Sequence, residues 1–394
     1  MKVAINGAGI AGPTLAYWLS RYGHEPVLIE QAPRRRSGGY IVDFWGAGYD
    51  VASMVGLQPR LHELGYDVKE VRFVGSEGRQ RGGFSTDAIR RTLGGRFVSL
   101  KRSDLAAAIY TALDGKVETI FDDSIATIDE GSAGVHVSFN RHGDETFDVV
   151  VGADGLHSRV RELQFGPTRQ FEVYLGYKAA AFELQGYPLR DEQTYVSYAE
   201  PGRQVSRFSM RDGRTLFLFV YKDPSATDIP LTHVGRKATL RNAFGDAGWE
   251  CPQILKRMDS TDEIYFDRIS QIQMRSWIKG RTALVGDAAA CVSLLAGEGS
   301  GLAMSEAFVL AGELARAQDN PMAGLANYQT RMMPFLQQRQ RAARRFAKSF
   351  IPKTTFGITL RNIISSLFAF PFVGDFLLGR LLRSNLNLPR YDRG

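Results

Sequence analysis

The chain has 394 residues, of which 44% are hydrophobic and 23% are charged, a balance that excludes a disordered chain and indicates a globular protein of two or three domains. Its two cysteines, Cys251 and Cys291, exclude a disulfide framework, and without zinc-site spacing around them we expect no metal centre and a reducing, cytoplasmic setting. The formal net charge of +7 suits an anionic partner, but no nucleic-acid motif accompanies the basic residues, so we expect no nucleic-acid partner.

The first thirty residues predict a strand–helix–strand unit. Lys2 to Asn6 is a short apolar strand, the glycine-rich turn Gly7 to Gly12 follows, Pro13 to Tyr22 has apolar residues at helical spacing, and Pro26 to Glu30 is a second apolar strand. The crossover between the two strands should be right-handed.

Four further segments are predicted before residue 155. Phe97 to Leu100 is a predicted strand, and Ser103 to Leu113 is a predicted helix. Val135 to Asn140 and Thr146 to Val151 are predicted strands around a turn. The second of them ends at the sequence Gly152-Ala153-Asp154-Gly155.

The character of the chain changes between residues 171 and 272. Thr194 to Tyr198, Gln204 to Met210 and Thr215 to Tyr221 are rich in aromatic and β-branched residues, and turn sequences separate them. This pattern predicts an antiparallel sheet in a separate domain. Aromatic side chains on one face of that sheet could line a substrate pocket, with Tyr195, Phe208 and Phe219 as candidates; the alternative is that they belong to the core.

The nucleotide-binding pattern resumes near residue 282. Thr282 to Val285 is a buried strand, the sequence Gly286-Asp287-Ala288-Ala289 follows, and Leu302 to Ala317 is a predicted helix. We therefore expect an α/β fold in which a Rossmann-like domain is interrupted by an antiparallel-sheet domain and followed by C-terminal helices. The expected ranges are 1–70, 97–170 and 273–327 for the Rossmann-like domain, 71–96 and 171–272 for the substrate domain, and 328–394 for the helical segment.

The glycine turn and Glu30 together predict dinucleotide binding. Gly7 permits the tight turn, Gly9 lets a pyrophosphate approach the backbone, and Gly12 permits close contact between helix and strand. The positive end of the helix then faces the phosphates, and Glu30 at the end of the next strand can accept hydrogen bonds from ribose hydroxyls. The neighbouring Ile10, Ala11 and Gln31 are expected at the same site.

Two later motifs add polar groups to this prediction. Asp154 follows one predicted strand and Asp287 follows another. A carboxylate at a strand end can hold a sugar-alcohol hydroxyl, while Gly297 and Gly299 let backbone N–H groups approach a flat ring at the start of a helix. Each motif alone is also compatible with an ordinary turn.

With all three motifs in this order, the chain resembles the class A flavoprotein monooxygenases, which include the p-hydroxybenzoate hydroxylase type and the tetracycline-inactivating enzymes. The resemblance implies that Gly7, Gly9 and Gly12 hold the FAD pyrophosphate and that Glu30 binds the adenosine ribose. It also implies that Arg102 lies beside the FAD phosphates, that Asp154 contacts FAD and a nicotinamide cofactor, and that Asp287 holds the ribityl chain.

The sequence departs from the family near the flavin ring. The family commonly has a histidine and prolines after the Gly-Asp-Ala-Ala sequence, where this chain has Ala290, Ser293 and Leu294. The common Gln or Lys between the last two glycines is Glu298. A negative group there would repel anionic reduced flavin and alter its redox potential.

The resemblance also implies a reaction. NADPH or NADH reduces the flavin, and reduced flavin takes up O2 to form a C4a-hydroperoxide that hydroxylates an aromatic or polycyclic small molecule. Arg36, in a basic cluster before a glycine pair, either helps to hold the nicotinamide cofactor or is solvated. Alternatives are a flavoprotein reductase or dehydrogenase that does not oxygenate, and a non-catalytic flavin-binding protein. The protein is expected to be a monomer or a dimer.

The C-terminal tail is strongly apolar from Ile358 to Leu382, but its charges, Pro371 and Gly374 argue against a membrane span. Two interpretations remain. The tail packs as helices against the nucleotide-binding domain and helps to cover the substrate entrance. Alternatively it makes peripheral contact with an anionic membrane through Phe368, Phe370 and Phe372.

Overall fold

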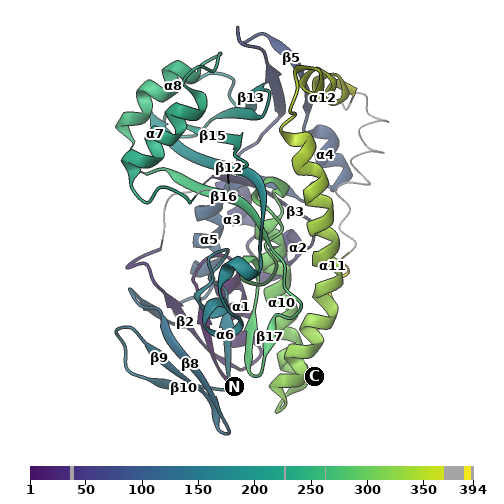
Figure 1. The fold of residues 1–394 in the computed structure, drawn as a ribbon. Coiled ribbons are helices and arrows are strands. Elements are labelled where there is room, and N and C mark those ends of the chain that lie inside the picture. Colours follow the sequence, from purple (N-terminus) through teal and green to yellow (C-terminus); the bar gives the residue numbers. More distant parts are fainter. Residues whose placement is uncertain (36–39, 226–227, 262, 368–385, 392–394) are drawn as a thin grey trace.

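The computed structural model describes residues 1–394 except for residues 36–39, 226–227, 262, 368–385 and 392–394. Figure 1 shows a mainly parallel sheet with its helices in the lower half of the molecule and a large antiparallel sheet in the upper half. The long helix α11 (Pro321–Phe350) runs along one side of the molecule and lies beside both halves.

The lower sheet has six strands with β1 near its middle. In spatial order the strands are β17 (Ile278–Lys279), β18 (Thr282–Leu284), β11 (Val149–Gly152), β1 (Lys2–Asn6), β2 (Glu25–Glu30) and β7 (Glu118–Phe121). All neighbours are parallel except β17 and β18. The four inner strands β18, β11, β1 and β2 are almost entirely buried, which explains their continuous apolar sequences.

Two helices pack closely beside the lower sheet. They are α1 (Ala11–Arg21) and α10 (Gly299–Ala317), which meet where the rings of Trp18 and Phe308 lie edge to face with centroids 4.8 Å apart. The expected α/β fold, with a Rossmann-like unit interrupted by an antiparallel sheet and followed by helices, is confirmed. The exact domain boundaries stay predictions.

The prediction of a single strand from Thr146 to Val151 is wrong. The structure divides it at Asp148 into β10 (Glu145–Phe147), which pairs with β9 (Gly134–Phe139), and β11, which pairs with β1. Asp148 accepts a hydrogen bond from the backbone N–H of Lys2 through its side chain at 2.7 Å and donates its own N–H to the Lys2 carbonyl at 2.9 Å. The first part of the segment, β10, therefore belongs to a three-stranded sheet with β9 and β8 (Ile125–Gly131). The second part, β11, belongs to the six-stranded sheet.

The upper sheet has seven strands and is antiparallel except where β13 meets β4. In spatial order the strands are β16 (Tyr265–Ile272), β12 (Glu172–Gln185), β15 (Arg214–Lys222), β14 (Arg203–Ser209), β13 (Thr194–Glu200), β4 (Glu70–Val74) and β5 (Gln80–Ser85). Helices α7 (His233–Phe244) and α8 (Cys251–Arg257) cover one of its faces (Figure 1). The other face turns toward the small two-stranded sheet of β3 (Ile41–Trp45) and β6 (Phe97–Lys101).

Short helices complete the described structure. They are α2 (Gly46–Val55), α3 (Gln58–Leu64), α4 (Asp87–Thr92), α5 (Arg102–Thr111), α6 (Arg159–Phe165), α9 (Asp287–Ala290), and the 3-10 turns η1 (Thr168–Gln170), η2 (Met258–Ser260) and η3 (Leu294–Ala296).

The C-terminal region packs on both halves of the molecule. Helix α12 (Thr355–Leu367) lies against β5, where Ser365 Oγ accepts the Gly83 backbone N–H at 3.2 Å. Farther along, Tyr391 lies on α10, and its hydroxyl donates to Glu313 at 2.8 Å. Phe368, Phe370 and Phe372 lie outside the described residues. Among the helices that the structure describes, none combines the length and apolar character needed to cross a membrane.

Candidate functional site

The glycine turn after β1 is packed too closely to carry side chains at its first and last positions. Gly7 has φ +113°, and a Cβ there would lie 2.6 Å from the carbonyl oxygen of Ala153. A Cβ on Gly12 would lie 1.9 Å from the carbonyl oxygen of Gly7. Both glycines are therefore needed to bring the start of α1 against the ends of β1 and β11.

Gly9 has a different environment, because its open side faces a cation. A Cβ built on Gly9 would meet only one described atom within 4 Å, the Arg102 Nη2 at 3.8 Å. Arg102 begins α5, directly after β6. Backbone N–H groups at the start of α1 and a guanidinium group opposite them form a cradle suited to phosphate oxygens.

Glu30 braces the glycine turn. One of its carboxylate oxygens accepts the Ala8 N–H at 3.0 Å, and the other accepts the Ala32 N–H at 3.0 Å. A carboxylate has about four acceptor positions, so both oxygens keep capacity for ribose hydroxyls. Of the residues expected beside it, Ile10 and Ala11 are buried and Gln31 is exposed.

The Asp154 carboxylate is largely occupied by protein donors. It accepts from Asn6 Nδ2 at 2.8 Å, from Ser158 Oγ at 2.6 Å, and from the backbone N–H groups of Arg159 at 2.7 Å and Val160 at 3.2 Å. Burial nevertheless raises the pKa of Asp154. Four donors use the acceptor capacity of one carboxylate, which favours a role in holding the loop beneath Gly7 over direct cofactor contact.

Asp287 stands at the C-terminal end of β18, beside the start of α10. A Cβ on Gly299 would lie 3.8 Å from Asp287 Oδ1, and Gly297 has φ +67°. Burial raises the pKa of Asp287, and the positive charge of Arg102 opposes that rise. The structure thus brings Asp287 and Gly299 close to Arg102, which is far from them in sequence.

A buried carboxyl group beneath Asp287 was missed by the sequence analysis. Glu306, which is 1% exposed, accepts the Gly286 N–H at 3.0 Å and contacts the Tyr328 hydroxyl at 3.2 Å. Burial raises the pKa of Glu306 to about 8. A glutamate inside the apolar helical run from Leu302 to Ala317 was the available indication, because such residues are rarely buried without a partner.

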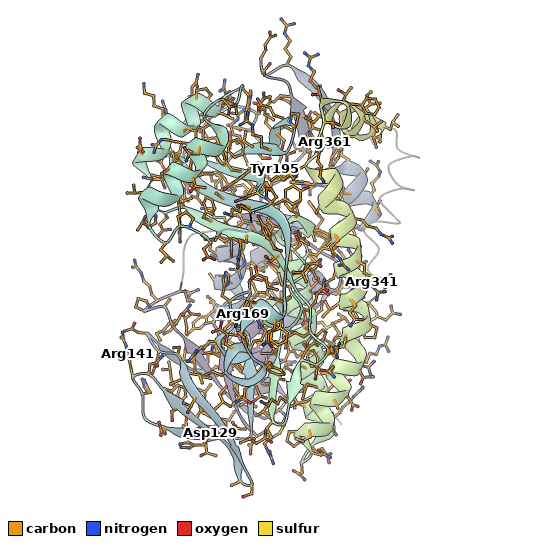
Figure 2. All side chains as sticks on the ribbon, viewed as in Figure 1. Asp129, Arg141, Arg169, Tyr195, Arg341 and Arg361 are labelled. Carbon is orange, nitrogen blue, oxygen red and sulfur yellow. The ribbon has the colours of Figure 1, made fainter. Side chains whose placement is uncertain are left out.

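The face of the upper sheet turned toward β3 carries an apolar layer. Its members include Val68, Ala181, Tyr195, Phe208, Met210, Leu216, Leu218 and Tyr265, with Tyr40 and Ile41 packed against them. The rings of Tyr195 and Phe208 lie 4.6 Å apart, and those of Tyr40 and Tyr265 lie 5.3 Å apart. Figure 2 shows Tyr195 within the upper sheet. A cavity of about 640 Å³ opens beside Phe208 and Met210.

The prediction that Phe219 lines a substrate pocket is corrected, because Phe219 lies on the face of the sheet that α7 and α8 cover. Its side chain is fully buried and stacks on Phe182, with ring centroids 5.6 Å apart, beneath Phe244 of α7. Successive side chains of a strand point to opposite faces, so Leu218 faces the apolar layer and Phe219 belongs to the core. Arg36 lies outside the described residues, and its role stays a prediction.

Comparison with known proteins identifies the family. A profile of the FAD binding domain family matches residues 1–343 of the chain, and a flavin-dependent monooxygenase of Legionella longbeachae is 32% identical over 360 residues, covering 90% of each protein. The chain belongs to the class A FAD-dependent monooxygenases.

Two further relatives match most of this chain. An uncharacterized protein of Mycobacterium tuberculosis is 35% identical to this monooxygenase over 342 residues, which is 86% of this chain and 91% of that protein. The crystal structure of the tetracycline destructase Tet(51) superimposes with a TM-score of 0.83 and 29% identity, covering 99% of both chains. The shared architecture therefore extends through the C-terminal helices.

The residues of the monooxygenase fit FAD. The cradle between Gly9 and Arg102 suits the pyrophosphate, Glu30 suits the adenosine ribose, and Asp287 suits a polyol chain at the start of α10. When bound, FAD supplies the redox chemistry. No cluster of His, Cys, Asp and Glu that could hold a metal ion occurs in the part of the chain that the structure describes.

Replacing Asp287 with alanine should weaken FAD retention, because ribityl hydroxyls lose a charged acceptor. Such hydrogen bonds contribute about 1.5–3 kcal/mol, which is roughly a tenfold to hundredfold rise in the FAD dissociation constant. Fluorescence titration of the apoprotein measures this. Asp129→Ala is the matched control, because Asp129 is exposed at the far end of the molecule (Figure 2). Equal affinity of the Asp287 and Asp129 variants would show that Asp287 does not hold the cofactor.

Glu306 should make stability fall with rising pH. Its pKa is about 8 in the folded protein against an ordinary 4.5, so the folded state binds the proton more tightly. The resulting stabilisation is complete below pH 4.5 and is lost as pH rises toward 8, by at most about 5 kcal/mol. Denaturant unfolding at pH 6 and pH 9 should show the loss in the parent and a flatter profile in Glu306→Gln. Identical profiles would contradict the assignment.

Proposed function

We propose that this monooxygenase uses NADPH or NADH and O2 to hydroxylate an aromatic or polycyclic small molecule. The supporting observation is the aromatic layer between the upper sheet and Tyr40, which adjoins Arg102 and Asp287. The cavity of about 640 Å³ beside Phe208 is within the size range of small-molecule sites, and it opens at the Phe208 and Met210 part of the layer, not at Tyr40. The layer itself is apolar and suits flat, hydrophobic substrates, whereas the cavity is also lined by charged side chains such as Asp67, Arg90 and Arg211.

In the proposed reaction, NAD(P)H, a proton, O2 and substrate give NAD(P)+, water and a product with one added oxygen atom. The route through a flavin C4a-hydroperoxide expected from the sequence belongs to this proposal. The protein's part is to bind the substrate and exclude water with the aromatic layer. A tyrosine hydroxyl is protonated at neutral pH, and burial raises the pKa of Tyr40 further, to about 12, so this hydroxyl can donate a hydrogen bond to a substrate oxygen.

The decisive experiment follows the oxygen atom. The FAD-loaded protein is incubated with NADPH or NADH, 18O2 and a panel of aromatic and polycyclic compounds, beginning with tetracyclines because of the similarity to tetracycline destructase Tet(51). A product that carries one 18O atom supports the proposal. A reduced or dehydrogenated product without 18O would favour the reductase alternative, and a flavin that no nicotinamide reduces would favour a non-catalytic flavin-binding protein.

A matched pair of variants tests the location of the substrate. Phe208 and Phe219 have the same side chain on opposite faces of one sheet. Phe208→Leu should raise the dissociation constant of the substrate, whereas Phe219→Leu should lower the free energy of unfolding and leave that constant unchanged. The reverse pattern would place the substrate elsewhere.

A further inference from the structure

One residue that departs from the family near the flavin, Glu298, has a partner on the C-terminal helix. Glu298 precedes α10, and Arg339 of α11 donates to both of its carboxylate oxygens, with the Nε to Oε2 distance at 2.7 Å. The side chains are only 15% and 20% exposed. A bidentate, mostly buried pair of this kind is geometrically defined and weakly screened by salt.

Helix α11 also holds the backbone of the loop that leads to Glu298. Gln340 donates to the carbonyl of Cys291 at 3.1 Å and to that of Ile272 at 2.6 Å, and Gln271 donates to the carbonyl of Val292 at 2.7 Å. Both glutamines are buried. The start of the loop between Cys291 and Glu298 is therefore held by Gln340 of α11 and by Gln271 of β16, and its end is held to α11 by the ion pair.

One residue of this loop is strained. Ser293 has φ +140°, a conformation that side-chain-bearing residues rarely adopt, and its hydroxyl accepts the Leu295 N–H at 3.3 Å. Strain of this kind persists only where surrounding contacts impose it. The contacts from Gln271 and Gln340 hold the two backbone carbonyls directly before Ser293, those of Val292 and Cys291.

The charges of Glu298 and Arg339 matter because Glu298 lies in the loop at which the flavin is expected to bind. Glu298 lies between Gly297 and Gly299, and a Cβ on Gly299 would lie 3.8 Å from Asp287 Oδ1. An unpaired carboxylate there would disfavour the extra negative charge of reduced flavin, whereas an unpaired guanidinium group would favour it. Paired, the two charges nearly cancel at the loop.

We propose that Glu298 and Arg339 form a positioning pair that sets the redox potential of the bound flavin, with Arg339 on the C-terminal helix neutralising the carboxylate. The proposal goes beyond the monooxygenase assignment and rests on FAD lying at the Gly297–Gly299 loop. It predicts that removal of either charge shifts the potential, and that the two shifts have opposite signs.

The test compares the midpoint potential of bound FAD in the parent, E298Q, R339Q and the double variant. E298Q should bind reduced FAD relative to oxidised FAD about tenfold more tightly, which raises a two-electron potential by about 30 mV. R339Q should lower it by a similar amount, and the double variant should return close to the parent. A merely structural role would not produce opposite shifts that cancel.

Two controls keep the test decisive. R331Q removes an arginine of the same helix that pairs with the buried Glu313 at 3.1 Å, and it should leave the potential unchanged. R339K keeps the charge and loses the bidentate geometry, so its potential should stay near that of the parent even if R339Q fails to fold. Shifts of the same sign in E298Q and R339Q, no shift in E298Q, or a potential of R331Q that moves equally would overturn the proposal. No organic substrate is present, so the outcome is independent of whether hydroxylation occurs.

Discussion

Replacing Gly7 with alanine should abolish FAD binding and destabilise the fold. A Cβ at this position would lie 2.6, 2.8 and 2.9 Å from backbone atoms of Ala153 and Asp154, and φ +113° is strained for alanine. Backbone strain and overpacking each cost about 1–3 kcal/mol. The neighbours are backbone atoms that cannot rotate away, so β1 and β11 must separate at the turn that cradles the phosphates. Absorbance of bound flavin and thermal unfolding measure the two effects.

Two glycine variants separate folding from cofactor binding. Gly9→Ala places its Cβ in open space 3.8 Å from Arg102, so we expect the apoprotein to keep its stability while FAD affinity falls. Gly143→Ala meets nothing within 4 Å and should change neither property. A Gly7→Ala protein that retains FAD and stability would show that the close contact with Ala153 does not hold the site together.

Truncation after Arg345 should cost the protein its solubility or its FAD. The deletion removes Ala347 and Ile351, which are buried against the upper sheet. It also removes Arg361, which donates to Gln204 at 2.6 Å, and Tyr391, which packs on α10. Figure 2 shows Arg361 between α12 and the upper sheet. These contacts support the packed interpretation of the tail, and purification followed by flavin quantification measures the loss.

The membrane interpretation makes the opposite prediction for the same proteins. Phe356 is 76% exposed on α12, and Arg341 stands on the outer side of α11 (Figure 2). If the tail only packs, the parent should not sediment with anionic liposomes, and Phe356→Ser should unfold as the parent does. A parent that sediments in a salt-sensitive way, together with a truncated form that stays folded and active, would overturn the packed interpretation.

Much of the candidate cofactor site could be predicted because its motifs are local. The turn from Gly7 to Gly12 must follow a strand and open a helix, and all of its geometry lies within one short stretch of chain. Asp287 likewise follows a short strand, and the apolar sequence of that strand predicts burial on both of its faces. The α/β fold followed from these elements and their order.

Other features depend on contacts between distant segments, and only the tertiary structure decided them. Whether Phe208 or Phe219 faces the apolar layer depends on the register and orientation of the sheet, since one residue reverses the face. The apolar run from Thr146 to Val151 divides between two sheets because Asp148 bonds to Lys2, 146 residues away. Neither pairing has a sequence signature.

The charged groups show most clearly that the sequence does not predict contacts between distant residues. The sequence shows an acidic residue at position 298 and an arginine at position 339. It does not predict that their side chains form an ion pair across 41 residues. Glu306 beneath Gly286 and the four donors around Asp154 are likewise products of packing. The amino-acid sequence by itself determined which local turns and strands can form and what cofactor they suit. The tertiary structure alone decided which charges meet, because an ion pair or a buried hydrogen bond depends on distances that only the folded chain sets.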